Sequence, residues 1–221
     1  MSTAPATEIA RRIAKAGTEE LRPFLLAAPP ALPLSPQRGD HDLNPHLQPT
    51  SPGELAPAAV LVPFVRHHDP TILFTRRTEH LARHAGQVSF PGGRLNPDDE
   101  SLVATALRET REETGIKEHL VSVAGFLDAY ETGTGFAILP VIGLLAPGFS
   151  LEPNPQEVAE IFEVPLVFLF DPANCRRDTR SWRGQIRAFH AFTYNGHYIW
   201  GATAALIVNL RERLGGVAAV T

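Results

Sequence analysis

The sequence predicts an α/β (α+β) fold in which a mixed β-sheet is sandwiched between helices. Two observations carry this prediction. From residue 58 onward, short runs rich in β-branched and aromatic residues alternate with turn signals, as in a sheet of several strands. Two or three segments with helical periodicity interrupt these runs, but without the regular strand–helix alternation of a doubly wound sheet. The length of 221 residues suits one domain with an added terminus, or at most two small domains.

The first 57 residues differ in composition from the rest of the chain. Ten of the 20 prolines lie there, which favours an irregular segment. Within it, Ile9, Ile13 and Ala16 have helical spacing, with Thr7 as a candidate N-cap. We therefore divide the chain into an N-terminal helix and proline-rich connector (1–57), a main domain (58–214) and a C-terminal tail (215–221).

The main domain begins with β-type runs and ends with a helix. The expected strands are 58–66, 71–77, 87–93, 121–130, 136–145, 189–194 and 197–201, with a further strand after the polar segment 154–162. Asn195-Gly196 is a strong signal for a two-residue hairpin turn between the last two strands. The segment 202–214 predicts a closing helix, which Gly215-Gly216 should end.

Composition excludes several classes of function. A net charge of −4 argues against broad binding to nucleic acid, which requires a basic surface. The single cysteine, Cys175, excludes an internal disulfide framework and fits a reducing compartment. No apolar run approaches the roughly 20 residues that span a bilayer, and we see no secretory signal. We expect a cytoplasmic protein that does not bind membranes, and a homodimer remains open.

The segment RETREETG, residues 108–115, is unusually acidic for a short helix. We expect Asp98 or Asp99 to cap this helix, Thr114 to be its last residue and Gly115 to end it. At 100° per residue, one apolar stripe faces the core, and Glu109, Glu112 and Glu113 converge on the other side. The stripe comprises Val103, Leu107, Thr110 and Thr114.

Two explanations account for the clustered carboxylates. Like charges one helical turn apart repel, so helix stability alone does not select Glu109 and Glu113. A divalent cation such as Mg²⁺ or Mn²⁺ would turn this repulsion into attraction, because these ions prefer oxygen ligands. The alternative is a solvated helix face on which Arg108 and Arg111 balance the glutamates.

The sequence around this helix decides between the two. A glycine pair precedes it in SFPGGRLNPDDESLVATALRETREETGI, and this stretch resembles the Nudix box, G-x5-E-x7-R-E-U-x-E-E-x-G-U with U apolar. The matching residues are Gly93, Arg108, Glu109, Glu112, Glu113, Gly115 and Ile116. Thr110 stands at the first U, and six residues rather than five separate Glu100 from Gly93.

The resemblance implies a Nudix-type fold and a metal-dependent hydrolase acting on a nucleoside diphosphate linked to another group. It implies that Glu109, Glu112 and Glu113 are metal-binding and catalytic, with Mg²⁺ or Mn²⁺ as cofactor, that Arg108 orients them, and that Gly93 shapes the loop. Such enzymes often use a further carboxylate outside the box, for which Glu157 and Glu160 are candidates; we assign Glu157 to catalysis. The alternative for both is an ordinary polar connection.

A second motif concerns the substrate. The segment LFTRRTEHLARHAGQVSFPGG, residues 73–93, resembles the signature of coenzyme A pyrophosphatases, L-L-T-x-R-[SA]-x3-R-x3-G-x3-F-P-G-G. The matching residues are Leu73, Thr75, Arg77, Gly86, Phe90, Pro91, Gly92 and Gly93. Ala82 occupies the second arginine position, with Arg83 beside it.

This second resemblance implies cleavage of coenzyme A or an acyl derivative into 3′,5′-ADP and 4′-phosphopantetheine. The expected substrate-binding residues are Arg77, Arg83, Phe90, Gly92 and Gly93, since arginine can hold phosphate oxygens in bidentate pairs. A related alternative is a Nudix hydrolase for ADP-ribose, a dinucleotide or a modified nucleoside triphosphate. An alternative of another class is a nucleotide sensor without catalysis.

Overall fold

The computed structural model describes residues 7–10, 12, 17–51, 53–81, 84–182 and 184–215. Within these residues the strands form a nine-stranded mixed sheet and a separate three-stranded sheet. The large sheet contains β1 (Arg38–Gly39), β2 (Ala56–Val65), β3 (Thr71–Arg77), β4 (Val88–Ser89), β5 (Gly92–Arg94), β6 (Val121–Phe126), β7 (Tyr130–Glu131), β8 (Phe136–Leu145) and β9 (Val158–Pro165). The small sheet contains β10 (Arg176–Trp182), β11 (Gln185–Tyr194) and β12 (His197–Trp200).

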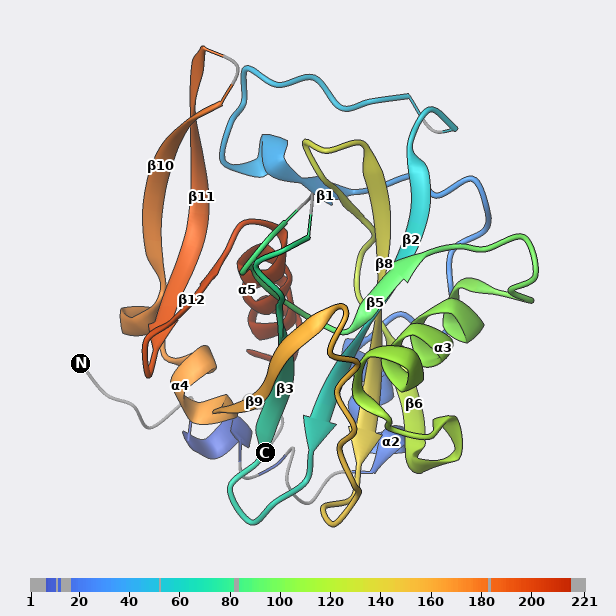
Figure 1. Ribbon diagram of the computed structural model, residues 1–221. Helices are drawn as coiled ribbons and strands as arrows, with labels where there is room; N and C mark the ends of the chain where they lie inside the picture. The colour runs from blue at the N-terminus through green and yellow to red at the C-terminus, as the bar shows by residue number, and fades with distance from the viewer. Residues whose placement is uncertain are drawn as a thin grey trace.

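The helices lie on both sides of the large sheet (Figure 1). They are α2 (Thr18–Leu21), α3 (Leu102–Thr114), α4 (Leu166–Phe170) and α5 (Ala202–Leu214), with short 3-10 segments η1 (Arg22–Phe24), η2 (Asp40–Asp42), η3 (Glu118–Leu120) and η4 (Pro172–Asn174). Figure 1 shows α3 on one side of β2 and β8, and α5 on the other side, next to the three-stranded sheet. The predicted fold class, a mixed sheet between helices, is confirmed.

The centre of the large sheet is the parallel pair β2 and β8, which are in register from Ala56–Phe136 to Val65–Leu145. Successive residues of β2 point to opposite faces, so Leu61 joins the core under α3 and Val62 joins the core that contacts α4 and α5. Both side chains are fully buried. A central strand buried on both faces explains the nearly continuous apolar run in this part of the sequence.

The N-terminal region packs against the main domain. Ile9, Leu21 and Leu25 belong to the same core as α5, and Leu34 belongs to the core under α3. Strand β1 adds to the large sheet by parallel pairing with β7. Residues 7–10 are helical as expected, whereas Ile13 and Ala16 of that expected helix lie outside the described residues. The division into domains at residues 57 and 214 stays a prediction.

Most predicted elements are present, and several others were not expected, among them β1. The prediction matches β3, β8 and α5 to the residue, and the turn between β11 and β12 has the positive φ angles of Asn195 (48°) and Gly196 (85°). Strand β10 and helix α4 were not predicted. The sequence of β10 is mostly polar and its side chains are largely exposed, so it lacks the apolar alternation that marks a strand.

No helix in the described part of the chain is long and apolar enough to span a membrane.

The capping of α3 differs from the prediction. Neither Asp98 nor Asp99 is the N-cap; the cap is Ser101, whose Oγ accepts a hydrogen bond from the backbone N–H of Ala104 (3.1 Å). The other end is as expected, because Gly115 closes the helix in the left-handed conformation (φ 78°). Asp99 therefore does not cap the helix; its side chain instead forms an ion pair with Arg108, which is described below.

Replacing Ser101 by Ala should lower the free energy of unfolding by about 1 kcal/mol, because the N–H of Ala104 loses its partner. Ser101→Asn keeps a capping oxygen and should stay within a few tenths of a kcal/mol of the parent protein. Asp98→Ala is the matched control, since Asp98 is exposed and is not the cap. Chemical denaturation of the four proteins checks this; equal loss in the Asp98 and Ser101 variants would contradict the assignment.

Candidate active site

The face of α3 that packs on the sheet includes an acid. The buried positions are Leu102, Thr105, Ala106, Thr110, Glu113 and Thr114. Val103 and Leu107, which we expected in the core stripe, are only partly buried at its margin. The stripe is thus rotated relative to the prediction, and Glu113 lies inside it rather than on the opposite side with Glu109 and Glu112. This rotation carries the last glutamate of the box into the protein interior.

Glu113 is 3% exposed and has few partners for its charge. One oxygen accepts a hydrogen bond from the backbone N–H of Gly92 at 3.3 Å, and the other lies 3.8 Å from a guanidinium nitrogen of Arg77. Burial raises the pKa of Glu113 to about 8, and the nearby charges of Glu109 and Glu157 act in the same direction. An additional positive charge at this carboxylate would therefore be strongly stabilising.

The glycine pair lets the loop before α3 touch the carboxylates. Strand β5 brings Gly92 and Gly93 against β2, opposite Val60 and Ala59. A Cβ atom at Gly93 would lie 2.4 to 2.6 Å from the carboxylate atoms of Glu109, and one at Gly92 would lie 2.4 Å from the carbonyl oxygen of Ala59. A side chain at Gly92 would collide with the backbone of β2, and one at Gly93 would displace the Glu109 carboxylate. The space that a side chain would fill is the space next to the Glu109 carboxylate.

Arg108 is fixed by the side chain of Asp99, which the sequence suggested only as a candidate helix cap. Its guanidinium makes a bidentate pair with Asp99, from Nε to Oδ1 at 2.8 Å and from Nη2 to Oδ2 at 2.9 Å. The carboxylate of Asp99 also accepts bonds from the backbone N–H of Asn96 and the hydroxyl of Thr105. The hydrogen bonds from Arg108, which have the largest effect, and those from Asn96 and Thr105 hold the pKa of Asp99 well below its usual range. Glu100, at the Nudix-box position, is exposed.

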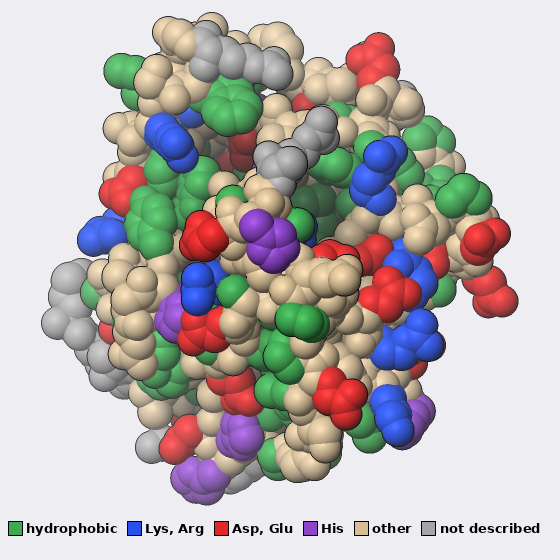
Figure 2. Space-filling model, in the orientation of Figure 1, with side chains coloured by type: hydrophobic (Ala, Val, Ile, Leu, Met, Phe, Trp, Pro, Cys, Tyr) green, Lys and Arg blue, Asp and Glu red, His purple; other side chains and the backbone are tan. Residues whose placement is uncertain are grey.

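The same guanidinium orients two glutamates of the box. Nη1 of Arg108 donates to Glu109 at 2.9 Å and to Glu112 at 3.1 Å. Burial raises the pKa of Glu109, and the charges of Glu112 and Glu157 add to this, although the bond from Arg108 opposes it. Arg108 thus contacts both glutamates that it was expected to orient, and its role in catalysis stays a prediction. Figure 2 shows acidic and basic side chains gathered over α3.

The donor set fits a hard divalent cation in its chemistry. Glu109, Glu112 and Glu113 offer only carboxylate oxygens, and the side-chain-free space at Gly93 adjoins one of them. Within the described residues, however, no three acidic, histidine or cysteine side chains converge into a ready-made cage. Arg108 lies between Glu109 and Glu112 instead, as their counterion. Collecting these oxygens around an ion therefore requires rotations of the side chains.

Glu157 belongs to the same cluster because its loop is fastened to the end of α3. The backbone N–H of Glu152 donates to the carbonyl of Thr114 (2.8 Å), and that of Asn154 donates to the carbonyl of Glu113 (3.1 Å). The charge of Glu157 reaches both Glu109 and Glu113, raising the pKa of each. Glu160, the other candidate, lies apart from this cluster in an ion pair with Arg76 at 3.1 Å.

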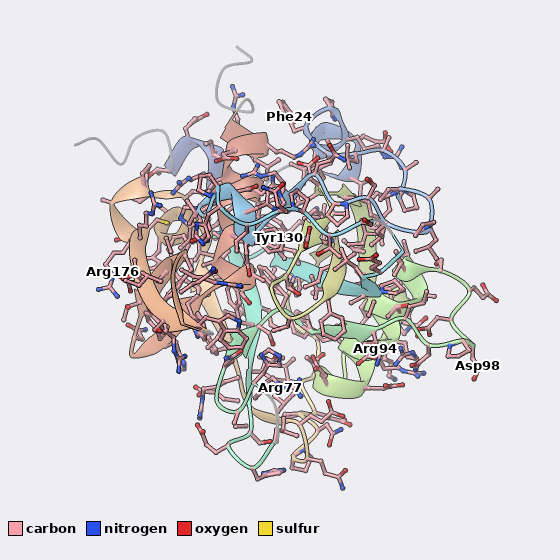
Figure 3. All side chains as sticks on the ribbon, turned by 90° about the horizontal axis from the view of Figure 1, so that it is seen from above. Phe24, Arg77, Arg94, Asp98, Tyr130 and Arg176 are labelled. Carbon is pink, nitrogen blue, oxygen red and sulfur yellow. The ribbon has the colours of Figure 1, made fainter. Side chains whose placement is uncertain are left out.

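The expected substrate-binding residues fall into three groups. Arg77 lies at the end of β3, in ion-pair range of Glu113, and its buried Nε has no hydrogen-bond partner among the described residues. Figure 3 places Arg77 between the three-stranded sheet and α3. Phe90 is 3% exposed and stacks on Phe74 at 4.9 Å, so it anchors the glycine turn as a core residue. Arg83, with Ala82, lies outside the described residues.

Comparison with known proteins shows the class to which this fold and site belong. The model of the NUDIX domain matches residues 55–182. A protein of Photorhabdus laumondii named "Uncharacterized Nudix hydrolase NudL" is 45% identical over 157 residues, covering 71% of this chain and 84% of that protein. One of the same name from Yersinia enterocolitica is 39% identical over 184 residues, covering 81% and 87%. The chain belongs to the Nudix hydrolase family.

Solved structures with a similar fold include the NUDIX domain of Shewanella oneidensis NrtR complexed with ADP ribose. It is 17% identical, with a TM-score of 0.48, and the match covers 78% of this chain and 97% of that chain. A Nudix hydrolase from M. smegmatis, RenU, is 18% identical with a TM-score of 0.45, covering 75% and 88%. With the family established, the protein is an enzyme, a pyrophosphohydrolase.

The raised pKa of Glu113 predicts a pH dependence of stability. Its pKa rises from an ordinary 4.5 to about 8 on folding, so the folded state binds a proton that the unfolded state releases between these values. In chelator-treated protein the free energy of unfolding should therefore fall from pH 5 to pH 8 relative to Glu113→Gln, which does not titrate. Thermal unfolding of both proteins measures the difference.

Mg²⁺ or Mn²⁺ should restore stability to the parent protein at pH 8 and have less effect on the Gln variant, because the variant has lost one anionic oxygen ligand. A stability difference that stays constant from pH 5 to pH 8 would show that Glu113 does not titrate in this window.

Proposed function

We propose that the protein hydrolyses the diphosphate bond of coenzyme A or its acyl derivatives, releasing 3′,5′-ADP and 4′-phosphopantetheine or its acyl form. The observation that carries the proposal is the position of Arg77. This arginine belongs to the coenzyme A pyrophosphatase signature, and its guanidinium lies 3.8 Å from the carboxylate of Glu113 in the Nudix box. The substrate motif and the catalytic motif thus meet at one ion pair.

Arg77 has the properties of a phosphate ligand. Its Nε is buried and has no partner among the described residues, so the guanidinium has hydrogen-bonding capacity left. Glu113 is its counterion at 3.8 Å, a contact too long for a hydrogen bond. In the proposal, Arg77 donates to an oxygen of the diphosphate, since arginine matches phosphate geometry.

The carboxylates have separate roles in the proposed mechanism. Glu109, Glu112 and Glu113 would hold Mg²⁺ or Mn²⁺, while Arg108, fixed by Asp99, keeps Glu109 and Glu112 near each other. A bound ion would supply positive charge to polarise the phosphoryl oxygen and to lower the pKa of water. Glu157 is assigned to accept the proton of the attacking water, because its charge acts on Glu109 and Glu113 and it is not among the carboxylates that Arg108 binds.

The proposal includes the cellular compartment of the enzyme, the cytoplasm. The single Cys175 is a free thiol, which suits the cytoplasm, where the substrate thiol also stays reduced. Small-molecule nucleoside diphosphates are the proposed partners, and nucleic acid is not, because the net charge of the whole chain is negative.

Replacing Glu109, Glu112 or Glu113 by Gln should reduce turnover of coenzyme A by roughly 10²- to 10⁴-fold, because each change keeps the size of the side chain but removes an anionic ligand or base. Glu118→Gln, an exposed carboxylate after the helix, is the matched control and should keep the parental rate. Chromatographic separation of the products, with Mg²⁺, with Mn²⁺ and with chelator, measures the rates. Parental rates in all three variants would refute the assignment.

Arg83→Ala tests whether the neighbour of Ala82 supplies the missing arginine of the signature. A lost charge-assisted hydrogen bond costs about 1.5–3 kcal/mol, or roughly 10- to 100-fold in kcat/KM. A loss confined to coenzyme A, and small for dephospho-coenzyme A, would place Arg83 at the 3′-phosphate; equal losses would place it at the diphosphate. No loss on either substrate, with no gain from Ala82→Arg, would show that this position does not read the substrate.

A panel of diphosphates separates the proposal from its rivals. Coenzyme A, ADP-ribose, a dinucleoside polyphosphate and modified nucleoside triphosphates are compared at equal concentration with Mg²⁺. A kcat/KM that is largest for coenzyme A would support the proposal. A larger kcat/KM for another compound would make that compound the substrate of this Nudix hydrolase instead. Binding without hydrolysis of any of them would indicate a sensor, a role against which the full set of box glutamates argues.

A further inference from the structure

Strand β10 is an open edge of the three-stranded sheet. Among the described residues, the order β10-β11-β12 leaves one side of β10 without a strand. Figure 1 shows β10 on the outside of the molecule, and Figure 3 shows Arg176, its first residue, at the periphery. The seven side chains from Arg176 to Trp182 are exposed, except for the half-buried Asp178. An edge of this length is a template for pairing with another strand.

The hydrogen bonds of β11 show which backbone groups of β10 point outward. The N–H and C=O of Ala188 bond to the side chain of Asn44 (2.8 and 2.9 Å), on the side away from β10. Ala188 is opposite Thr179, so in the alternating pattern of an antiparallel pair Thr179 also directs its N–H and C=O away from β11. Arg177 and Ser181, two residues away on either side, point the same way.

We propose that β10 pairs with β10 of a second copy of this chain, antiparallel about a two-fold axis at Thr179, and so joins the two small sheets into one continuous sheet. In this register Thr179 faces Thr179 of the second copy, and Arg177 faces Ser181. Each of these outward residues exchanges both backbone hydrogen bonds with its counterpart. The interface is isologous, as a two-fold dimer requires.

The side chains of β10 are self-complementary only in this register. Asp178 lies opposite Arg180 of the second copy, and Arg180 lies opposite Asp178, which makes two ion pairs across the axis. Tyr198 already directs the Asp178 carboxylate through a 2.7 Å hydrogen bond, and Arg180 lies over the ring of Trp200 at 5.8 Å. A threonine pair on the axis adds a favourable cross-strand contact.

Other registers are opposed by charge. Because outward-facing residues must pair with outward-facing residues, the axis can shift only to Asp178 or Arg180 without losing most of the overlap. The first shift places Asp178 against Asp178, and the second places Arg180 against Arg180. Like charges directly opposite each other destabilise a strand pair. The charges that would protect a free edge from random pairing thus select one partner and one alignment.

The expected dimer is reversible. Two seven-residue strands bury much less surface than the roughly 1,200–2,000 Å² of a stable interface. Dissociation in the micromolar range follows, so the average mass should rise with concentration between about 1 µM and about 1 mM. Sedimentation equilibrium of the full chain measures this. A mass equal to the monomer throughout this range would overturn the proposal.

Charge reversal tests the register. Asp178→Arg alone places arginine opposite arginine, and Arg180→Asp alone places aspartate opposite aspartate, so each variant should be monomeric. Mixing the two variants places arginine at positions 178 and 180 of one copy opposite aspartate at the same positions of the other, and should restore the dimer at least to parental affinity. The double variant, with both charges exchanged, should also dimerise. Monomers in the mixture, or unchanged dimers in both single variants, would refute this register.

Thr179→Pro tests the backbone contact. Thr179 directs its N–H away from β11, so proline removes a donor to the second copy without removing one from the hairpin. The variant should weaken the dimer by at least tenfold, while Thr179→Val, which keeps the N–H, should not. Circular dichroism establishes that each variant is folded. Equal dimerisation of the proline and valine variants would show that β10 does not pair through its backbone.

Discussion

The burial of the Glu113 carboxylate is the constraint on which the rest of the site depends. A charged acid in the interior is costly unless a cation accompanies it. Here one guanidinium stands at 3.8 Å and one backbone N–H at 3.3 Å, which is incomplete compensation for a side chain that is 3% exposed. The raised pKa is the consequence. Because the charge of Glu113 is only partly neutralised, a metal ion bound beside it would stabilise α3.

Arg108 distributes the remaining charge around this acid. It joins a carboxylate that is fixed in the loop before the helix, Asp99, to two that point toward the site, Glu109 and Glu112. The bidentate pair fixes the plane of the guanidinium, so the third nitrogen has little freedom in choosing its acceptors. The glycine turn completes the arrangement, because Gly92 lets β5 approach the backbone of β2 and Gly93 leaves room for the Glu109 carboxylate in its present position.

The sequence predicted the elements of the fold better than their contacts. Apolar periodicity located β3, β8 and α5, whose residues are buried on regular faces. It could not locate β10, which buries little, nor show that Leu21 and Leu25 complete the core, because burial of a short N-terminal segment depends on partners far away in the chain. In the site, the motif identified the glutamates. The rotation of α3, which puts Glu113 inside, depends on packing by Leu102 and Ala106 that a helical wheel does not weigh.

Glu100 departs from the spacing of the Nudix box, and the acid that contacts Arg108 is its neighbour Asp99. The box requires one acid that lies both six positions beyond its glycine and eight positions before its arginine. In this chain the two conditions fall on neighbours: Asp99 keeps the distance from Gly93, and Glu100 keeps the distance from Arg108. In the structure Asp99 forms the ion pair with Arg108, while Glu100 is exposed. The loop that leaves the glycine turn therefore determines which acid reaches the arginine, and the added residue is absorbed before Ser101 begins the helix.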